Sequence, residues 1–300
     1  MIPKLKPALE IEEQIKNLKI KHKLIINDTN KAKEILESVN YYRLTGYGLG
    51  LKRKGNEDEY IDGISLEHIY KLYQFDTKLR NALIRIIEEI EIEFRTHISY
   101  YHSIKYGSEG YVDKANFEDK NNKNKESVHQ KMLDKFHEEC LRQSNMPCVK
   151  HHNEKYAGHF PLWAATELFT FGNTCTFYNI MKKDDRRELA KRYYGCKPEY
   201  LYSWILSLVE VRNICAHYNR LYNFPLKQCP RLFKQDKQNM IKNNLNKLFP
   251  VILVIKHITR SSECWKQFLK DLIKLFDDNS DVIRLDFIDF PVNWKDLLKE

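Results

Sequence analysis

The side chains best suited to chemistry in this chain lie within nine residues, between Arg212 and Arg220. Histidine, here His217, suits proton transfer near neutral pH, because the unperturbed pKa of imidazole is about 6.5. Arg212 carries a permanent charge on a planar fork that matches phosphate oxygens, and Asn213 adds an amide that can orient a bound group. Because RNA carries its own nucleophile, the 2′-hydroxyl, such a set can cleave a phosphodiester without a metal.

A helix must position these residues. Lys197-Pro198-Glu199 is typical of a helix start, since proline fits the first turn and acids suit a helix N-terminus. One buried face is then indicated by the spacing of Leu201, Trp204, Ile205, Leu208, Val211 and Cys215. Asn213 and His217 are four residues apart and share a stripe of this helix, with Arg212 about 100° away around the axis.

The arginine and histidine pattern also has a structural interpretation, because such pairs occur on solvated helix faces and in hydrogen-bond networks. Arg95 and His102 form a second match, with six residues between them. We interpret that block as part of a helix core. The acidic run that contains Glu91 is expected to face solvent or to pair with Arg85 and Arg95.

The charge of the chain is concentrated beside the motif. Ten Lys or Arg and one acid, Asp236, lie between Arg212 and Arg260, which gives +9, equal to the net charge of the whole chain. This pattern predicts contact with a polyanion. The residues predicted to bind RNA are Arg220, Lys227, Arg231, Lys234 and Lys237. Aromatic residues that could stack on unpaired bases are Tyr218, Tyr222, Phe224 and Phe233. The alternative is a solvated basic helix over 237–247.

Several separated sequence blocks resemble the AbiD/AbiF-type abortive-infection proteins of bacteria, a branch of the HEPN superfamily. In order, the blocks are VNYYRLTGY (39–47), IEIEFR (90–95), PLWAATE (161–167) with TFG (170–172), EVRNICAH (210–217) and FPVNW (290–294). Arg212 and His217 match the Arg-x4–6-His motif of that superfamily, and Asn213 matches the polar residue that often follows the arginine.

The resemblance implies an all-α fold, a HEPN-like helical bundle with N- and C-terminal helical elaborations. It implies one domain over 1–300, composed of an N-terminal part (1–64), a core with the motif (65–260) and a C-terminal part (261–300). It also implies metal-independent RNA cleavage in phage defence or a toxin–antitoxin system. With one convincing motif in the chain, a homodimer is expected to pair two motif helices.

Composition excludes several other classes of protein. No run of about 18 apolar residues is present, so we expect no membrane span, and the N-terminus lacks an apolar signal core. Seven scattered cysteines without a Cys-x2-Cys pair argue against a disulfide framework or a zinc knuckle. His151 and His152, near Cys148 and His159, are too irregularly spaced to predict a metal site. We therefore expect a cytoplasmic protein with no cofactor and no bound metal.

Helix signals divide the rest of the chain. Helices are expected over Pro7–Leu24, Ala32–Val39 and Ser65–Tyr106, with a turn or small hairpin at 52–63 and a polar loop at 113–127. A helix through Met132 and Leu141 precedes a His-rich connection to Pro161. Two short helices separated at Gly172 then precede helices over Asp184–Tyr193 and Trp265–Phe276.

Two other functions are compatible with the same residues. One is a noncatalytic RNA-binding protein, including one complexed with a regulatory noncoding RNA. The other is a protein-interaction subunit that senses a phage component and is held inactive by an RNA or protein antitoxin. His217 is dispensable in both, and RNA cleavage by a His217→Ala variant separates them from a ribonuclease.

Overall fold

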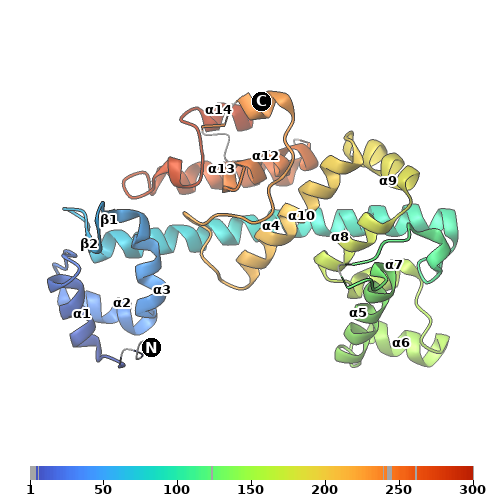
Figure 1. Ribbon diagram of the computed structural model, residues 1–300, viewed down its shortest axis with the longest axis horizontal. Coiled ribbons are helices and arrows are strands. Elements are labelled where there is room, and N and C mark those ends of the chain that lie inside the picture. The colour runs from blue at the N-terminus through green and yellow to red at the C-terminus, as the bar shows by residue number, and fades with distance from the viewer. Residues whose placement is uncertain are drawn as a thin grey trace.

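The computed structural model describes residue 5 and residues 7–122, 124–238, 240–241, 245–260 and 262–299, and its fold is all-α, as predicted. Over these residues the sheet structure is one antiparallel hairpin, β1 (Lys52–Arg53) and β2 (Asn56–Tyr60), within the predicted turn region. Figure 1 shows an elongated molecule with a lobe at each end of one long helix.

The α-helices follow one another from the N-terminal lobe to the opposite lobe and back to the middle. They are α1 (Ile11–Ile20), α2 (Thr29–Ser38), α3 (Tyr41–Thr45), α4 (Leu66–Tyr106), α5 (Val128–Arg142), α6 (Pro147–Tyr156), α7 (Leu162–Leu168), α8 (Phe171–Ile180), α9 (Lys183–Leu189), α10 (Pro198–Ala216), α11 (Lys234–Gln238), α12 (Leu248–Thr259), α13 (Glu263–Asp277) and α14 (Trp294–Lys299).

Helix α4 forms the axis of the molecule. It has 41 residues, so it is about 60 Å long. The predicted ends are confirmed: the Ser65 hydroxyl accepts a hydrogen bond from His68 N–H at 3.1 Å, and Gly107 ends the helix with φ of 85°. Its apolar stripe is buried along its whole length, from Ile69 to Ile98. Both lobes and the middle helices are therefore built on one continuous element.

The N-terminal lobe contains α1, α2, α3 and the hairpin (Figure 1). Asp28 caps α2 by accepting hydrogen bonds from the N–H groups of Asn30 and Lys31, as the sequence predicts for this loop. The first helix is shorter than the predicted Pro7–Leu24. The YYRLTG block does not simply end the second helix, because Asn40 caps a separate helix, α3.

The opposite lobe, α5 to α9, differs from the prediction in three places. The expected His-rich connection contains helix α6, which has Pro147 in its first turn. The break between α7 and α8 lies at Phe169–Thr170, because the Thr170 hydroxyl caps α8; Gly172 lies inside α8. The helix expected over Asp184–Tyr193 is α9 followed by one turn of π-helix, and Gly195 ends it with φ of 63°.

Helices α12, α13 and α14 cover one side of the middle of α4 (Figure 1). Phe75 of α4 packs edge-on against Phe276 of α13, with ring centroids 5.3 Å apart. The alternative of a solvated basic helix over 237–247 is not supported, because α11 covers Lys234–Gln238 and the described residues 240–241 and 245–247 are not helical; residues 239 and 242–244 lie outside the described residues. In the part of the chain that is described, no helix has both the length and the apolar character that crossing a bilayer requires.

Candidate active site

Helix α10 carries the motif and has the face predicted from its apolar spacing. Pro198 lies in its first turn, and Trp204, Ile205 and Leu208 are buried. The helix ends at Ala216, so His217 is the residue that caps its C-terminus, with φ of −93° and ψ of 12°. The chain then turns at Tyr218, which has φ of 56°. The motif histidine is thus presented at a helix end and not along a helix side.

Arg212 is anchored to the long helix α4. Its Nε lies 3.3 Å from Oε2 of Glu91, and its Nη2 donates a hydrogen bond to Oε1 of Glu91 at 3.5 Å. Glu91 also pairs with Arg95, whose Nη2 donates to the carbonyl of Phe169 at 2.7 Å. One buried carboxylate therefore orients two arginines, and this three-residue cluster keeps a net positive charge.

Part of the Arg212 guanidinium is free to bind a ligand. Its Nη1 donates a hydrogen bond to Oδ1 of Asn213 at 3.2 Å, while the Nε edge faces Glu91. A guanidinium has five N–H groups, so donors on Nη1 and Nη2 are left for an anion. The side chain of Arg212 is 32% exposed, and that of Glu91 is 8% exposed. Glu91 therefore holds the inner side of the Arg212 guanidinium, and the outer side can bind an anion.

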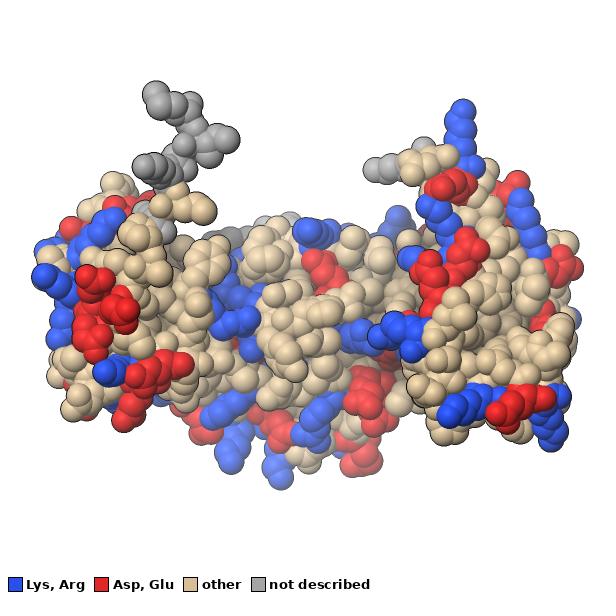
Figure 2. Space-filling model, turned by 90° about the horizontal axis from the view of Figure 1, so that it is seen from below, with Lys and Arg blue, Asp and Glu red and all other residues tan. Residues whose placement is uncertain are grey.

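His217 and Asn213 are exposed. No side chain or backbone group in the described part of the chain hydrogen-bonds to the His217 ring. The C-terminal end of α10 reaches the underside of the molecule between the two lobes (Figure 1). Figure 2 views this underside, where Lys and Arg side chains lie on both sides of the central region. The imidazole is accessible to a macromolecular substrate.

The turn after the motif is fixed to the N-terminal lobe. Arg43 of α3 donates from Nη1 to the carbonyl of Tyr218 at 2.5 Å, and Arg220 donates from Nη1 to the carbonyl of Gly46. Arg220 is half-buried, and this burial lowers the pKa of its guanidinium. Its role in substrate binding stays a prediction, because one of its terminal nitrogens already holds the fold.

A buried carboxylate on α4 fixes the next two residues of this turn. Asp76 accepts hydrogen bonds from the backbone N–H groups of Tyr222 at 2.8 Å and Leu221 at 3.3 Å. It also accepts one from the Tyr47 hydroxyl at 2.7 Å and pairs with Arg80. Because Asp76 is fully buried, its hydrogen bonds to these two N–H groups anchor the chain shortly after His217 to α4.

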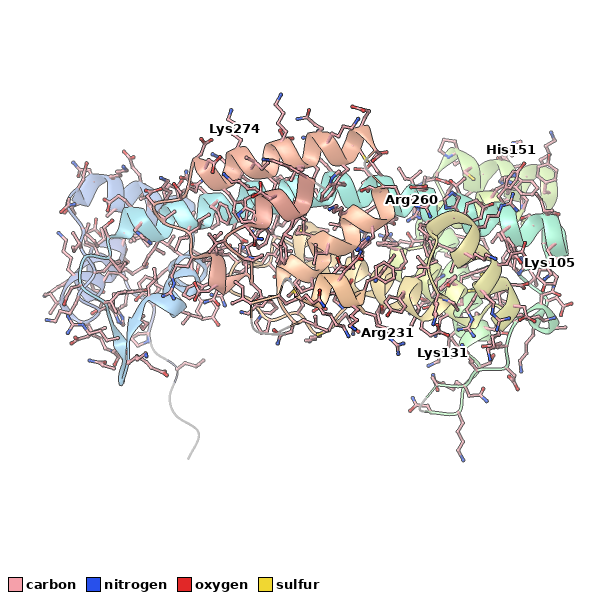
Figure 3. All side chains as sticks on the ribbon, turned by 90° about the horizontal axis from the view of Figure 1, so that it is seen from above. Lys105, Lys131, His151, Arg231, Arg260 and Lys274 are labelled. Carbon is pink, nitrogen blue, oxygen red and sulfur yellow. The ribbon has the colours of Figure 1, made fainter. Side chains whose placement is uncertain are left out.

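The segment that follows the turn lies against the side of α10. Glu210 accepts hydrogen bonds from the N–H groups of Lys227 and Gln228, and the Ser203 hydroxyl accepts one from Arg231 N–H. This segment carries four of the predicted RNA-binding cations, which we call the basic segment: Lys227, Arg231, Lys234 and Lys237. All four are exposed, and none forms an ion pair with a described residue. In Figure 3, Arg231 extends outward from the middle of the molecule.

Two of the four aromatic residues expected to stack on bases are not available. Tyr222 is 1% exposed, and its hydroxyl accepts a hydrogen bond from Arg284 N–H. Phe233 stacks on Tyr200, with ring centroids 5.1 Å apart. These residues pack in the core because the segment folds back on α10. Tyr218 and Phe224 are exposed.

The second arginine and histidine match is structural, as interpreted. His102 is fully buried among Tyr106, Phe117 and Phe177, and burial lowers its pKa to about 4. Among the described residues, no group of three or more His, Cys, Asp or Glu side chains is arranged to hold a metal ion. His152, from the His-rich stretch, instead hydrogen-bonds to the carbonyl of Cys148.

Three residues of this site were not identified from the sequence: Arg43, Asp76 and Glu91. Arg43 lies in a block that marked the resemblance, which could have suggested a role in positioning. Glu91 lies in the acidic run, where it alone falls on the buried face of α4. Asp76 had no signal beyond a charged residue at a position of the apolar repeat.

The family follows from a match over most of the chain. A family model described as Abi-like protein matches residues 34–223, which include α3, α4 and the whole of α10. The chain belongs to the Abi-like protein family. No curated protein and no solved structure matches. Membership of the Abi-like family points to abortive-infection phage defence. The match ends directly after the turn that Asp76 holds, so the Abi-like unit contains the motif, Glu91 and Arg43.

Proposed function

We propose that this Abi-like protein is a metal-independent endoribonuclease of the HEPN type, related to the AbiD/AbiF proteins. The observation that carries the proposal is the anchoring of Arg212. Buried Glu91 on α4 holds the Arg212 guanidinium on one side. The outer edge of that guanidinium and the exposed His217 both lie at the C-terminal end of α10. Such support of a reactive group by buried neighbours is what a pre-organised site requires.

The proposed reaction uses the substrate's own nucleophile. The 2′-hydroxyl oxygen attacks the adjacent phosphorus, and the bond from phosphorus to the 5′-oxygen breaks. A base removes the 2′-hydroxyl proton, an acid protonates the departing 5′-oxygen, and the products are a 2′,3′-cyclic phosphate and a 5′-hydroxyl. His217 acts as base or acid, Arg212 stabilises the charge that develops on the phosphate, and Asn213 orients it.

Two motifs in a homodimer would complete this chemistry, since one chain offers a single accessible histidine at the site. In a twofold arrangement the two α10 ends face one another, and the second His217 supplies the acid or base that the first does not. The exposed position of His217 on the underside leaves it open to such a partner. An RNA or protein antitoxin would then act by covering this face.

A noncatalytic RNA-binding role is the second candidate, because Glu91 already neutralises part of the charge of Arg212. In that role the exposed basic segment binds RNA and His217 is dispensable. Cleavage separates the two candidates.

The test is cleavage of RNA by His217→Ala. Loss of a residue that transfers protons lowers the rate by about 10²–10⁴-fold. His151→Ala is the matched control, because His151 is also exposed but lies in the opposite lobe (Figure 3). A folded His217→Ala variant that cleaves RNA like the wild type would exclude the catalytic role. A variant that binds RNA normally but does not cleave it is the expected result.

A further inference from the structure

A large cavity opens beside the motif, between the N-terminal lobe and the turn after α10. Its volume is about 780 Å³, within the range of small-molecule sites. Its lining includes Tyr41, Tyr42, Arg43, Lys52, Tyr60 and Arg220, and we call it the lobe cavity. Asn219, which also lines it, is two residues after His217, so the lobe cavity adjoins the site proposed for cleavage.

The lobe cavity contains three cations from three different elements. Arg43 donates a hydrogen bond to the carbonyl of Tyr218, and Arg220 donates one to the carbonyl of Gly46. Lys52 donates one to the carbonyl of Asp58 at 3.2 Å. These partners are backbone groups, so they orient the cations without cancelling their charge.

These cations form no salt bridge with a described residue, although Asp58 attracts Lys52 and Asp76 attracts Arg220 at longer range. No Asp or Glu among the described residues forms a salt bridge with Arg43, Lys52 or Arg220, and Glu57 is the one acid in the described lining. Burial lowers the pKa of both Lys52 and Arg220. Bringing an anion into the cavity would offset this cost of burying positive charge.

Tyrosines also line the lobe cavity. Tyr42 lines the lobe cavity, and its side chain is 87% exposed. Tyr60 is 1% exposed, and its buried hydroxyl has no hydrogen-bond partner among the described residues. Lys52 lies over the Tyr60 ring, with its Nζ 3.5 Å from the centroid.

We propose that the lobe cavity binds one unpaired nucleotide of the RNA, next to the phosphate that is cut. The cations bind a phosphate of that nucleotide, and its base stacks on Tyr42. The combination of cations and an exposed aromatic ring is typical of sites that bind single-stranded nucleic acids. The identification of the ligand as RNA rests on the proposed function. The lobe cavity then decides where on a strand the Abi-like protein cuts.

The test measures binding and not cleavage. A short, labelled single-stranded RNA with 2′-fluoro groups lacks the nucleophile, so its affinity is measured by fluorescence anisotropy without turnover. Tyr42→Ala should weaken binding by about 5- to 150-fold, the scale of one stacked base. The fold should survive because Tyr42 is exposed. Tyr100→Ala is the matched control, since Tyr100 is 64% exposed near the other end of α4.

A second pair of variants tests the charge. Lys52→Gln should reduce the slope of log affinity against log salt concentration by about 0.7, the value for one lost contact with a single strand. Lys54→Gln should leave the slope unchanged, because Lys54 lies in the same hairpin region but outside the lining. Equal binding by wild type and Tyr42→Ala, or equal slopes for all three proteins, would overturn the proposal.

Free AMP and UMP distinguish a nucleotide in an RNA strand from a small nucleotide ligand. They should compete with the RNA only at millimolar concentration, because they lack contacts outside the lobe cavity. Micromolar affinity for AMP or UMP that is lost in Tyr42→Ala would overturn the assignment to RNA. If no RNA is cleaved but binding depends on Tyr42, the ribonuclease proposal fails and the lobe cavity stands. If RNA is cleaved and Tyr42→Ala binds normally, only the lobe cavity proposal fails.

Discussion

Replacing Glu91 by glutamine should weaken the anchoring of Arg95 and Arg212, the two arginines that pair with it. At the 3.3 Å between Glu91 and Arg212, and with an effective dielectric constant of about 20, the direct attraction is about 5 kcal/mol. The net loss is smaller, because Arg212 is 32% exposed and the glutamine carbonyl still accepts one hydrogen bond. We expect the free energy of unfolding to fall by about 1–2 kcal/mol. Thermal unfolding should then show a Tm lower by about 2–5 °C.

Activity should fall more than stability. Without the Glu91 charge, Arg212 is held less firmly, and a displacement of about 1 Å in a catalytic group costs about 100-fold in rate. The assay is cleavage of a fluorescent RNA, with kcat and KM separated. Glu88→Gln is the control, because Glu88 is exposed on the same helix, and it should match the wild type. Wild-type or faster cleavage by folded Glu91→Gln would show that Glu91 restrains Arg212 instead of positioning it.

Four further outcomes follow from the site and its surroundings. Cleavage should persist in excess EDTA and leave a 2′,3′-cyclic phosphate; complete loss with recovery on added Mg²⁺ would contradict the proposed chemistry. Replacing the basic segment with glutamines should flatten the salt dependence of RNA binding, by about 0.7 in slope for each lost contact, and an unchanged slope would place the RNA elsewhere. Light scattering should detect a dimer at micromolar concentration, and adding His217→Ala chains should reduce wild-type activity more steeply than dilution does; full activity from a strict monomer would exclude the composite site. Burial lowers the pKa of His102 from 6.5 to about 4. Between these pH values the unfolded chain binds a proton that the folded chain does not, so the free energy of unfolding falls as the pH falls, by up to about 3 kcal/mol. His102→Phe should remove that part of the acid sensitivity in urea titrations at pH 7 and pH 4.5, and an unchanged difference between the two pH values would contradict it.

The sequence predicted the helices best where periodicity and caps agree. The long helix α4 has an apolar residue at every turn, a serine before it and a glycine after it, and both ends were correct. The stretch that forms α6 has few apolar residues and several histidines, so its helix was missed although proline stood at its start. Local pattern does not reveal a helix whose inward face is short.

The site was predicted less completely, because its supports come from distant parts of the chain. Arg212 and His217 stand out within one helix, whereas Glu91 is 121 residues away from Arg212, and Asp76 is 145 residues from Leu221. No spacing rule connects such positions. Tyr222 was misjudged for the same reason: its chemistry suits base stacking, but only the fold shows that it faces Phe75 in the core, with ring centroids 5.8 Å apart.

The two acids of α4 that support the motif, Asp76 and Glu91, must keep a fixed spacing along this helix. Asp76 holds the turn after α10 and Glu91 holds Arg212, and fifteen residues, about four turns, separate them. Insertion of one residue between them would rotate one acid by about 100° relative to the other and shift it by about 1.5 Å along the axis. Insertion of a whole turn would restore the rotation but shift one acid by about 5.4 Å along the axis, so it would also break one of the two contacts. The spacing of Asp76 and Glu91 is therefore as strongly constrained as their identity, whereas the polar loop at 113–127 is free of this restriction on its length.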